Sequence, residues 1–224
     1  MSMQKGARDW EWERQFGHHV VGVIGIFVLC TSGSASAGPQ PQKLSGSFEV
    51  PHNDLANAEA LANKLAALSP RVDPKEATLV AESAYATVSR LRRQYRMFGT
   101  PIFNNFLVYH GFRERGYCYQ WTADLLVALD ALKLKTLELH WGESYAGTWR
   151  ENNCLVVTAK AQPFDHGMIL EAWRHFGHLR WNLLLSDEDR YFENTKYAQR
   201  VRERAANRHV AFQSRASGNG KAGE

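Results

Sequence analysis

The spacing of apolar residues changes once along this chain, and that change limits the folds it can adopt. Up to Leu132, apolar side chains recur every three or four residues, which is the period of an amphipathic helix. From Leu134 to Trp141 they alternate, which is the period of a strand with one buried face. Helices followed by strands predict an α+β domain, with N-terminal helices packed on a small antiparallel sheet.

Two helices are expected in the first part of the domain. The first covers 53–68, and the second begins after Asp73, whose side chain can cap a helix, with Pro74 at the first helical position. The arginines opposite the apolar stripe of the second helix are expected on a solvated face. The next segment, 101–116, is ambiguous, because its apolar run 106–109 fits a short strand or a buried loop.

The N-terminus has the pattern of a signal peptide over residues 1–37. A charged region is followed by an apolar run over 20–30, which is short for a membrane span, and then by small residues ending in Ala-Ser-Ala at Ala37. Cleavage after Ala37 predicts a periplasmic or secreted protein. An uncleaved segment would instead anchor the protein to a membrane, and we expect no other membrane contact.

Composition divides the rest of the chain and argues against one class of partner. Residues 38–50 have the composition of a linker, 51–192 that of a single α+β domain, and 193–224 that of a polar, basic and disordered tail. The net charge of +4 arises from 27 basic and 23 acidic residues that are interleaved. A nucleic-acid partner is therefore not expected, because such proteins usually carry a clustered basic face.

Cys118 is the residue on which the functional prediction depends. It lies where a loop-like segment ending in Arg115-Gly116 gives way to an apolar helix, so its thiol is expected in the first helical turn. The helix dipole and free N–H groups there favour a thiolate. After removal of residues 1–37, Cys154 is the only other cysteine. Cys118 is then a nucleophile, half of a disulfide with Cys154, or a buried thiol.

The strands expected after this helix relate Cys118 to Cys154. They cover 134–141, 154–159, 168–173 and 179–181. If Asn152 faces Cys118, then Cys154, two residues further on, faces the same way. If Asn153 faces it, Cys154 points away and Cys118 stays free.

A helix that opens with cysteine and is followed by strands resembles the core of transglutaminase-like and papain-like cysteine enzymes. In those families a histidine leads the second following strand, and an aspartate or asparagine lies on the next strand. Cys118 matches the cysteine, Asn152 and Asn153 occupy the region of the histidine, and Glu171 occupies that of the aspartate. The resemblance covers roughly 115–173 and rests on the order of the elements.

The resemblance implies an exported thiol hydrolase or acyltransferase-like domain in which Cys118 attacks an amide or ester bond, with a peptide or cell-wall substrate and no cofactor. An asparagine cannot accept the proton, so another histidine would be the base. His140, at the end of the first strand, is the first choice and His166 the second. The supporting groups would be Glu171 or Asn153, which orient the base, and Gln120, which donates to the oxyanion together with the helix N-terminus.

The same asparagines also favour a second function. The chain would then be a non-catalytic envelope protein with a degenerate cysteine-enzyme fold. It would bind a partner or a glycan through a sheet rich in tryptophan, although such residues more often pack in a core. His175 and His178 have a spacing that could bind a metal, but Gly177 between them favours a turn, and no metal site is expected.

Overall fold

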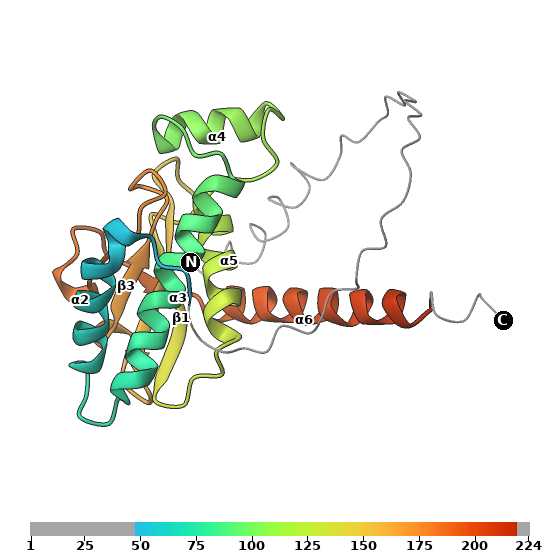
Figure 1. Ribbon diagram of the computed structural model, residues 1–224. Coiled ribbons are helices and arrows are strands. Elements are labelled where there is room, and N and C mark those ends of the chain that lie inside the picture. Colours follow the sequence, from blue (N-terminus) through green and yellow to red (C-terminus); the bar gives the residue numbers. More distant parts are fainter. Residues whose placement is uncertain (1–47, 219–224) are drawn as a thin grey trace, which may run out of the picture. The chain divides into compact units, whose positions relative to one another are not determined.

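The computed structural model describes residues 48–218. The predicted signal peptide, 1–37, and most of the predicted linker, 38–50, lie outside the described residues. Within them, helices and a five-stranded antiparallel sheet form an α+β fold, as expected (Figure 1). None of the helices described is long and apolar enough to cross a bilayer.

Four α-helices precede the sheet, and two of them begin at a residue whose side chain caps the helix. The four are α2 (Leu55–Ala66), α3 (Pro74–Gln94), α4 (Pro101–Tyr109) and α5 (Cys118–Asp130). As predicted, Asp73 caps α3, and its Oδ1 accepts a hydrogen bond from Lys75 N at 2.9 Å. Thr100 caps α4 in the same way, with its Oγ1 accepting from Phe103 N at 3.1 Å. The run 106–109 is therefore helical, and the prediction of a strand or buried loop was wrong.

The sheet has the strand order β4-β3-β2-β1-β5, and all its neighbours are antiparallel. The strands are β1 (Leu137–Ser144), β2 (Asn152–Ala159), β3 (Met168–Glu171), β4 (Arg180–Leu183) and β5 (Phe192–Glu193). All eight residues of β2 are buried. A strand buried along its whole length must be covered on both faces.

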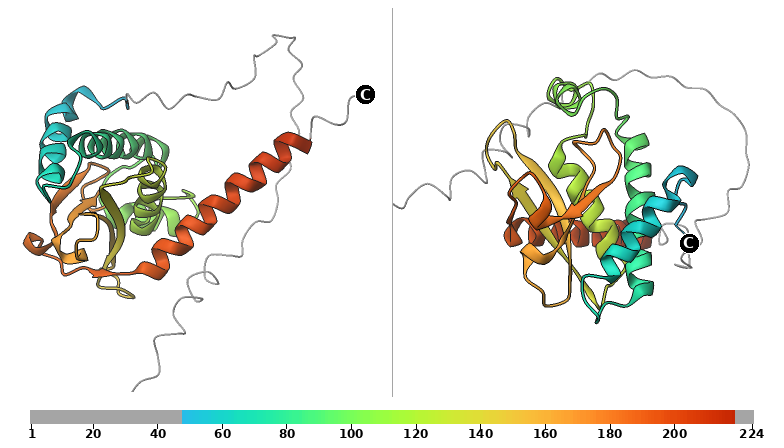
Figure 2. Two further views of the ribbon diagram at one scale, coloured as in Figure 1. Left: turned by 90° about the horizontal axis from the view of Figure 1, so that it is seen from below. Right: turned by 90° about the vertical axis from the view of Figure 1, so that its left-hand side faces the viewer.

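Different parts of the chain cover the two faces of the sheet. Helices α2, α3 and α5 pack together on one face, with α5 directly on β2 (Figure 2). Leu139, Leu155 and Leu170 belong to the core on this helical face. The opposite face has a smaller core that contains Val156 and Ile169. It is closed by the short helices η2 (Phe164–His166) and η3 (Leu184–Ser186), with Phe164 and Leu184 packed into it.

A further helix, α6 (Thr195–Gly218), follows the sheet, so the prediction of a disordered tail was wrong over most of 193–224. Ala198 and Val201 pack in the core on the helical face. Arg202 joins α6 to the rest of the domain, because its Nε lies 3.1 Å from Asp130 Oδ1 and its Nη2 donates to Leu139 O at 3.1 Å.

One carboxylate ties α3 to the start of β1. Glu76 lies in the first turn of α3, and its side chain accepts hydrogen bonds from the backbone N–H groups of Lys135, Thr136 and Leu137 at 2.9–3.0 Å. These bonds fix the chain where it leaves the turn after α5. They set where β1 begins relative to α3.

Replacing Glu76 tests this connection. We expect Glu76→Ala to lower the free energy of unfolding by about 1–3 kcal/mol, because three N–H groups lose a charged acceptor. Glu76→Gln keeps one acceptor oxygen and should lose less. Urea denaturation measures both, with the exposed neighbour Lys75→Ala as the matched control. If Glu76→Ala and Lys75→Ala lower the free energy of unfolding equally, Glu76 does not connect α3 to β1 in the way described.

Candidate functional site

Cys118 is the first residue of α5, which confirms the predicted position at a helix start. Gly116 has a φ of 151°, a conformation that favours glycine, as the chain turns into the helix. Gln120 Oε1 accepts hydrogen bonds from Gly116 N at 2.6 Å and Tyr117 N at 3.1 Å. The Gln120 oxygen thus serves the helix cap, and the donation to an oxyanion, which would come from Nε2, stays a prediction.

The segment before Cys118 is also attached to α3. Arg115 Nη2 lies 2.8 Å from Asp124 Oδ1, and Arg115 Nε donates to Tyr95 OH at 3.2 Å. Tyr95 OH donates to Asp124 Oδ2 at 2.5 Å, and the Tyr95 ring packs edge-on against Trp121. Burial and the nearby Asp124 carboxylate raise the pKa of Tyr95, so this hydroxyl keeps its proton. These contacts hold the start of α5 in one position.

The partner of the Cys118 thiol is Asn153. Asn153 Nδ2 donates to Cys118 Sγ at 3.3 Å, and Cys118 Sγ donates to the carbonyl oxygen of Glu151 at 3.7 Å. Asn153 Oδ1 accepts a hydrogen bond from Trp141 Nε1 at 2.9 Å, and Nδ2 also donates to Glu151 Oε1 at 3.2 Å. The side chain of Asn153 therefore connects α5, β1 and the start of β2.

Asn153, and not Asn152, faces α5. This is the arrangement in which strand alternation turns Cys154 away and leaves Cys118 free. Asn152 lies on the other face, where its Nδ2 donates to Tyr191 OH at 2.8 Å. Cys154 belongs to the core on that face, and both Cys118 and Cys154 are free thiols. The alternative of a disulfide between them is wrong in this structure.

The surroundings of Cys118 favour the neutral thiol. Burial raises the pKa of Cys118 to about 11, even though hydrogen bonds from the Asn153 side chain and from backbone N–H groups lower it. The Glu151 carboxylate raises it further, because a thiolate would lie beside a like charge. The stabilisation expected from the helix start is therefore present but smaller than the cost of burial.

The space next to the Cys118–Asn153 pair is small. A cavity of about 10 Å³ is bordered by Asn153, Thr122 and Trp121. Small-molecule sites usually have volumes of about 300–1,000 Å³. Cys118 is itself only 7% exposed. A substrate could reach the sulfur only if the surrounding side chains moved.

His140 lies on the opposite face of the sheet from Cys118. Along β1, Leu139 and Trp141 face the helices, and His140 alternates with them. Its Nδ1 lies 2.8 Å from Glu193 Oε1, and its Nε2 lies 2.9 Å from Thr158 Oγ1. No histidine of the described residues hydrogen-bonds to Cys118 Sγ, which instead contacts the Glu151 carbonyl oxygen and Asn153 Nδ2. The structure thus separates the proposed nucleophile from the proposed base.

The other candidate histidines are also far from that role. His166 is exposed in η2 and lies 4.0 Å from Asp165 Oδ1. His175 Nε2 lies 3.8 Å from Glu171 Oε2. Among residues 48–218, no three side chains of His, Cys, Asp or Glu are grouped closely enough to hold a metal ion.

Glu171 lies on the same face as Cys154. Met168 and Leu170 of β3 face the helices, and Ile169 and Glu171 alternate with them. Glu171 Oε1 accepts from Arg174 N at 2.8 Å, while Oε2 is buried without a hydrogen bond. Burial raises the pKa of Glu171 to about 7. Glu171 is thus a buried carboxyl group that cannot orient a base beside Cys118.

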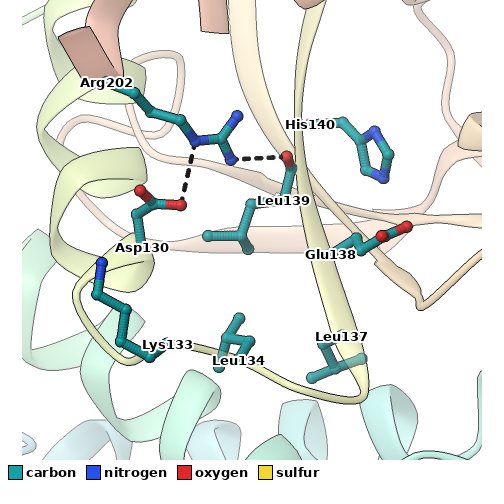
Figure 3. Close-up of a pocket in the computed structure, with 8 residues that line it drawn as sticks. All are labelled: Asp130, Lys133, Leu134, Leu137, Glu138, Leu139, His140 and Arg202. Carbon is teal, nitrogen blue, oxygen red and sulfur yellow. Dashed lines mark hydrogen bonds and ion pairs between the residues drawn. The ribbon is translucent and has the colours of Figure 1, made fainter. Parts of the chain in front are cut away.

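A larger pocket lies at the other end of α5 from Cys118. It has a volume of about 450 Å³, and Figure 3 shows its lining residues: Asp130, Lys133, Leu134, Leu137, Glu138, Leu139, His140 and Arg202. Asp130 and Cys118 are the last and first residues of α5, which places them about 18 Å apart along the axis. This pocket therefore does not serve the thiol.

Two members of the Cys118 cluster were missed from the sequence. Trp141 was expected only as an apolar strand residue, yet its indole N–H fixes the Asn153 amide. Glu151 carried no signal, because it precedes β2 in an irregular loop. Three further tryptophans of the described residues lie in different surroundings: Trp173 is buried, Trp181 Nε1 donates to Tyr85 OH at 3.0 Å, and Trp149 is exposed.

Glu171 should make stability depend on pH. Its pKa is about 7 in the folded chain against an ordinary 4.5, so the folded state binds the proton more tightly. The resulting stabilisation is fully present below about pH 4.5 and is lost as the pH rises to about 7; the pKa difference corresponds to about 3 kcal/mol. Glu171→Gln should lack this loss, and urea denaturation at several pH values measures it. Glu188→Gln, at an exposed glutamate, is the control. If the free energies of unfolding of Glu171→Gln and of the unmodified chain differ by the same amount at every pH, the raised pKa of Glu171 is contradicted.

Comparison of the chain with protein-family models, with curated proteins and with solved structures found no match in any of the three. Any function assigned to this protein therefore depends on the surroundings of Cys118 and on the surface of the domain. Those surroundings are a neutral thiol, an amide in place of a base, and little room for a substrate.

Proposed function

We propose that this protein is a non-catalytic binding domain with the element order of a transglutaminase-like or papain-like cysteine enzyme. The observation that carries the proposal is the 3.3 Å hydrogen bond from Asn153 Nδ2 to Cys118 Sγ. Asn153 lies at the start of β2, the second strand after the cysteine helix, where those enzymes have their histidine. The pattern of residues 1–37 supports a periplasmic or secreted location for the domain.

Thiol catalysis requires a base that takes the proton from sulfur. The Asn153 amide donates to sulfur and cannot take that proton. With a pKa of about 11, only about one Cys118 in ten thousand is ionised at pH 7. His140 would have to cross the sheet to act as the base, and its two ring nitrogens already have partners on the far face. These contacts favour the binding protein over the hydrolase or acyltransferase.

Cys118 has a structural role in this proposal. The chain of contacts from Cys118 through Asn153 to Trp141 satisfies buried polar groups on three elements. An unpaired buried indole N–H or amide costs about 1–3 kcal/mol. The cluster therefore stabilises the packing of α5 on the sheet, and the binding activity belongs to the surface.

The reactivity of Cys118 tests this proposal. In a chain with Cys30→Ala and Cys154→Ala, Cys118 is the only thiol. We expect its alkylation by iodoacetamide, followed by mass spectrometry, to increase with pH up to about 11 without a plateau near neutrality. A plateau with a midpoint below the ordinary thiol pKa of about 8.5 would identify an activated nucleophile and contradict the proposal.

Asn153→His in the same background is the matched variant. It puts an imidazole where the amide now lies, and an imidazolium beside sulfur would lower the thiol pKa. We expect alkylation at pH 7 to be faster than in the unmodified site by on the order of tenfold. If the unmodified site already reacts as fast as Asn153→His, Cys118 is activated by another group. Circular dichroism checks that the variant is folded.

A further inference from the structure

Helix α4 exposes a cluster of apolar side chains to solvent. The cluster, called the α4 aromatic surface, consists of Phe98, Ile102, Phe103, Phe106, Tyr109 and Phe112. Their exposed fractions range from 43% for Phe103 to 73% for Phe112. A single exposed apolar side chain needs no explanation, but a group of this kind usually marks an interaction site.

The rings of this surface are in contact with one another. Phe103 lies 6.5 Å from Phe98 and 6.4 Å from Phe106, measured between ring centroids. His110 joins the series, at 4.3 Å from Phe106 and 6.5 Å from Phe112. The aromatic side chains therefore form one continuous apolar strip along α4 and the turn that follows it.

The polarity of α4 is inverted, with a polar side chain buried and aromatic side chains exposed. Asn104 is 1% exposed, and its Nδ2 donates to Phe98 O at 2.6 Å and to Thr100 O at 2.9 Å. Its Oδ1 accepts a hydrogen bond from Arg113. These bonds tie Asn104 to the residues that flank α4, and with Asn104 turned inward the aromatic side chains of the helix lie outside.

The surroundings of the α4 aromatic surface are cationic. From Ser83 to Glu114 the chain contains five arginines, Arg90, Arg92, Arg93, Arg96 and Arg113, and one acidic residue, the exposed Glu114 at its end. Arg96 is close enough to Arg113 that its charge, together with burial, lowers the pKa of the Arg113 guanidinium. Two guanidinium groups next to each other attract an anionic partner.

We propose that the α4 aromatic surface docks on the surface of a membrane that contains anionic lipids. The proposal deepens the binding function above and rests on it, because it names the partner. Aromatic side chains are favoured at the boundary between headgroups and acyl chains, and arginines bind anionic headgroups. At nine residues, α4 is about 14 Å long, too short to span a bilayer but suited to lie in its surface.

The shape and charge of this surface favour a membrane over a second copy of the chain. Figure 1 shows α4 at one end of the domain, apart from the sheet. Ile102 and Phe106 lie one turn apart on α4 and both are exposed, so both can meet a flat bilayer at this end. Two copies joined through α4 would bring Arg96 and Arg113 of each close to those of the other, and the like charges would repel.

Vesicle binding tests the proposal on the full chain. Sedimentation is measured with vesicles of phosphatidylcholine alone and of equal parts phosphatidylcholine and phosphatidylglycerol. We expect the chain to bind the mixed vesicles and Ile102→Ser/Phe106→Ser/Phe112→Ser to bind them at least tenfold more weakly. Arg96→Gln should lower binding to the mixed vesicles by about fivefold and leave binding to phosphatidylcholine unchanged.

The matched control removes three exposed apolar side chains elsewhere: Trp149→Ser/Leu185→Ser/Phe192→Ser. It should bind as the unmodified chain does. Equal binding by the control and the α4 triple variant would assign the interaction to another segment, such as the apolar run at 20–30, and overturn the proposal. Absence of binding to the mixed vesicles would also overturn it, as would sedimentation analysis showing a dimer that the α4 triple variant abolishes.

The measurements of thiol reactivity and of vesicle binding test the two proposals separately. A reactive Cys118 in a chain that still binds vesicles through α4 would overturn the non-catalytic function alone. An unreactive Cys118 in a chain that does not bind vesicles would leave that function standing and reject the membrane as its partner.

Discussion

Burial of β2 on both faces is the constraint on which the rest of the domain depends. All eight residues of Asn152–Ala159 are buried, with helices on one face and short connecting segments on the other. Strand alternation then decides which environment each side chain meets. Asn153 faces Cys118 and α5, and Cys154 faces the side of Glu171 and Tyr191. The two cysteines are therefore separated by the sheet itself.

The period of the apolar residues predicted most of the fold. It located α2, α3 and α5 and four of the strands, because each of these elements buries one regular stripe. It also contained the information that His140 lies away from the thiol. Leu137, Leu139 and Trp141 form the apolar face of β1, and the helices cover that face. His140 alternates with them, so the same pattern that predicted the strand put this histidine on the other side.

Two helices escaped prediction for different reasons. Four large apolar residues of α4, Ile102, Phe103, Phe106 and Tyr109, are exposed, so the rule that apolar side chains are buried favoured a strand or buried loop, although Thr100-Pro101 is a good helix start. In α6, only a few apolar residues such as Ala198 and Val201 reach the core, and Val210, further along the helix, is exposed. Hydrogen bonds between side chains one turn apart stabilise such a helix without producing an apolar pattern in the sequence. An example is the bond from Gln199 Nε2 to Glu203 Oε1 at 2.8 Å.

The protonation state of Cys118 depends on opposing effects on its pKa, and the local sequence does not show which of them is larger. A helix start favours a thiolate, and the backbone and Asn153 donors act in that direction. Burial depends on what packs over the sulfur, which involves β2 and the loop before it, more than thirty residues further along the chain. The sequence could therefore identify the candidate thiol but not its protonation state.

The internal hydrogen bonds of Asn104 have a kinetic consequence for α4. They hold the helix in one orientation before any partner arrives, with Phe98 O, Thr100 O and Arg113 as its anchors. A surface that is already ordered pays little conformational entropy on association. Contact with a target through this end of the domain should then form without waiting for α4 to become ordered, which favours fast association.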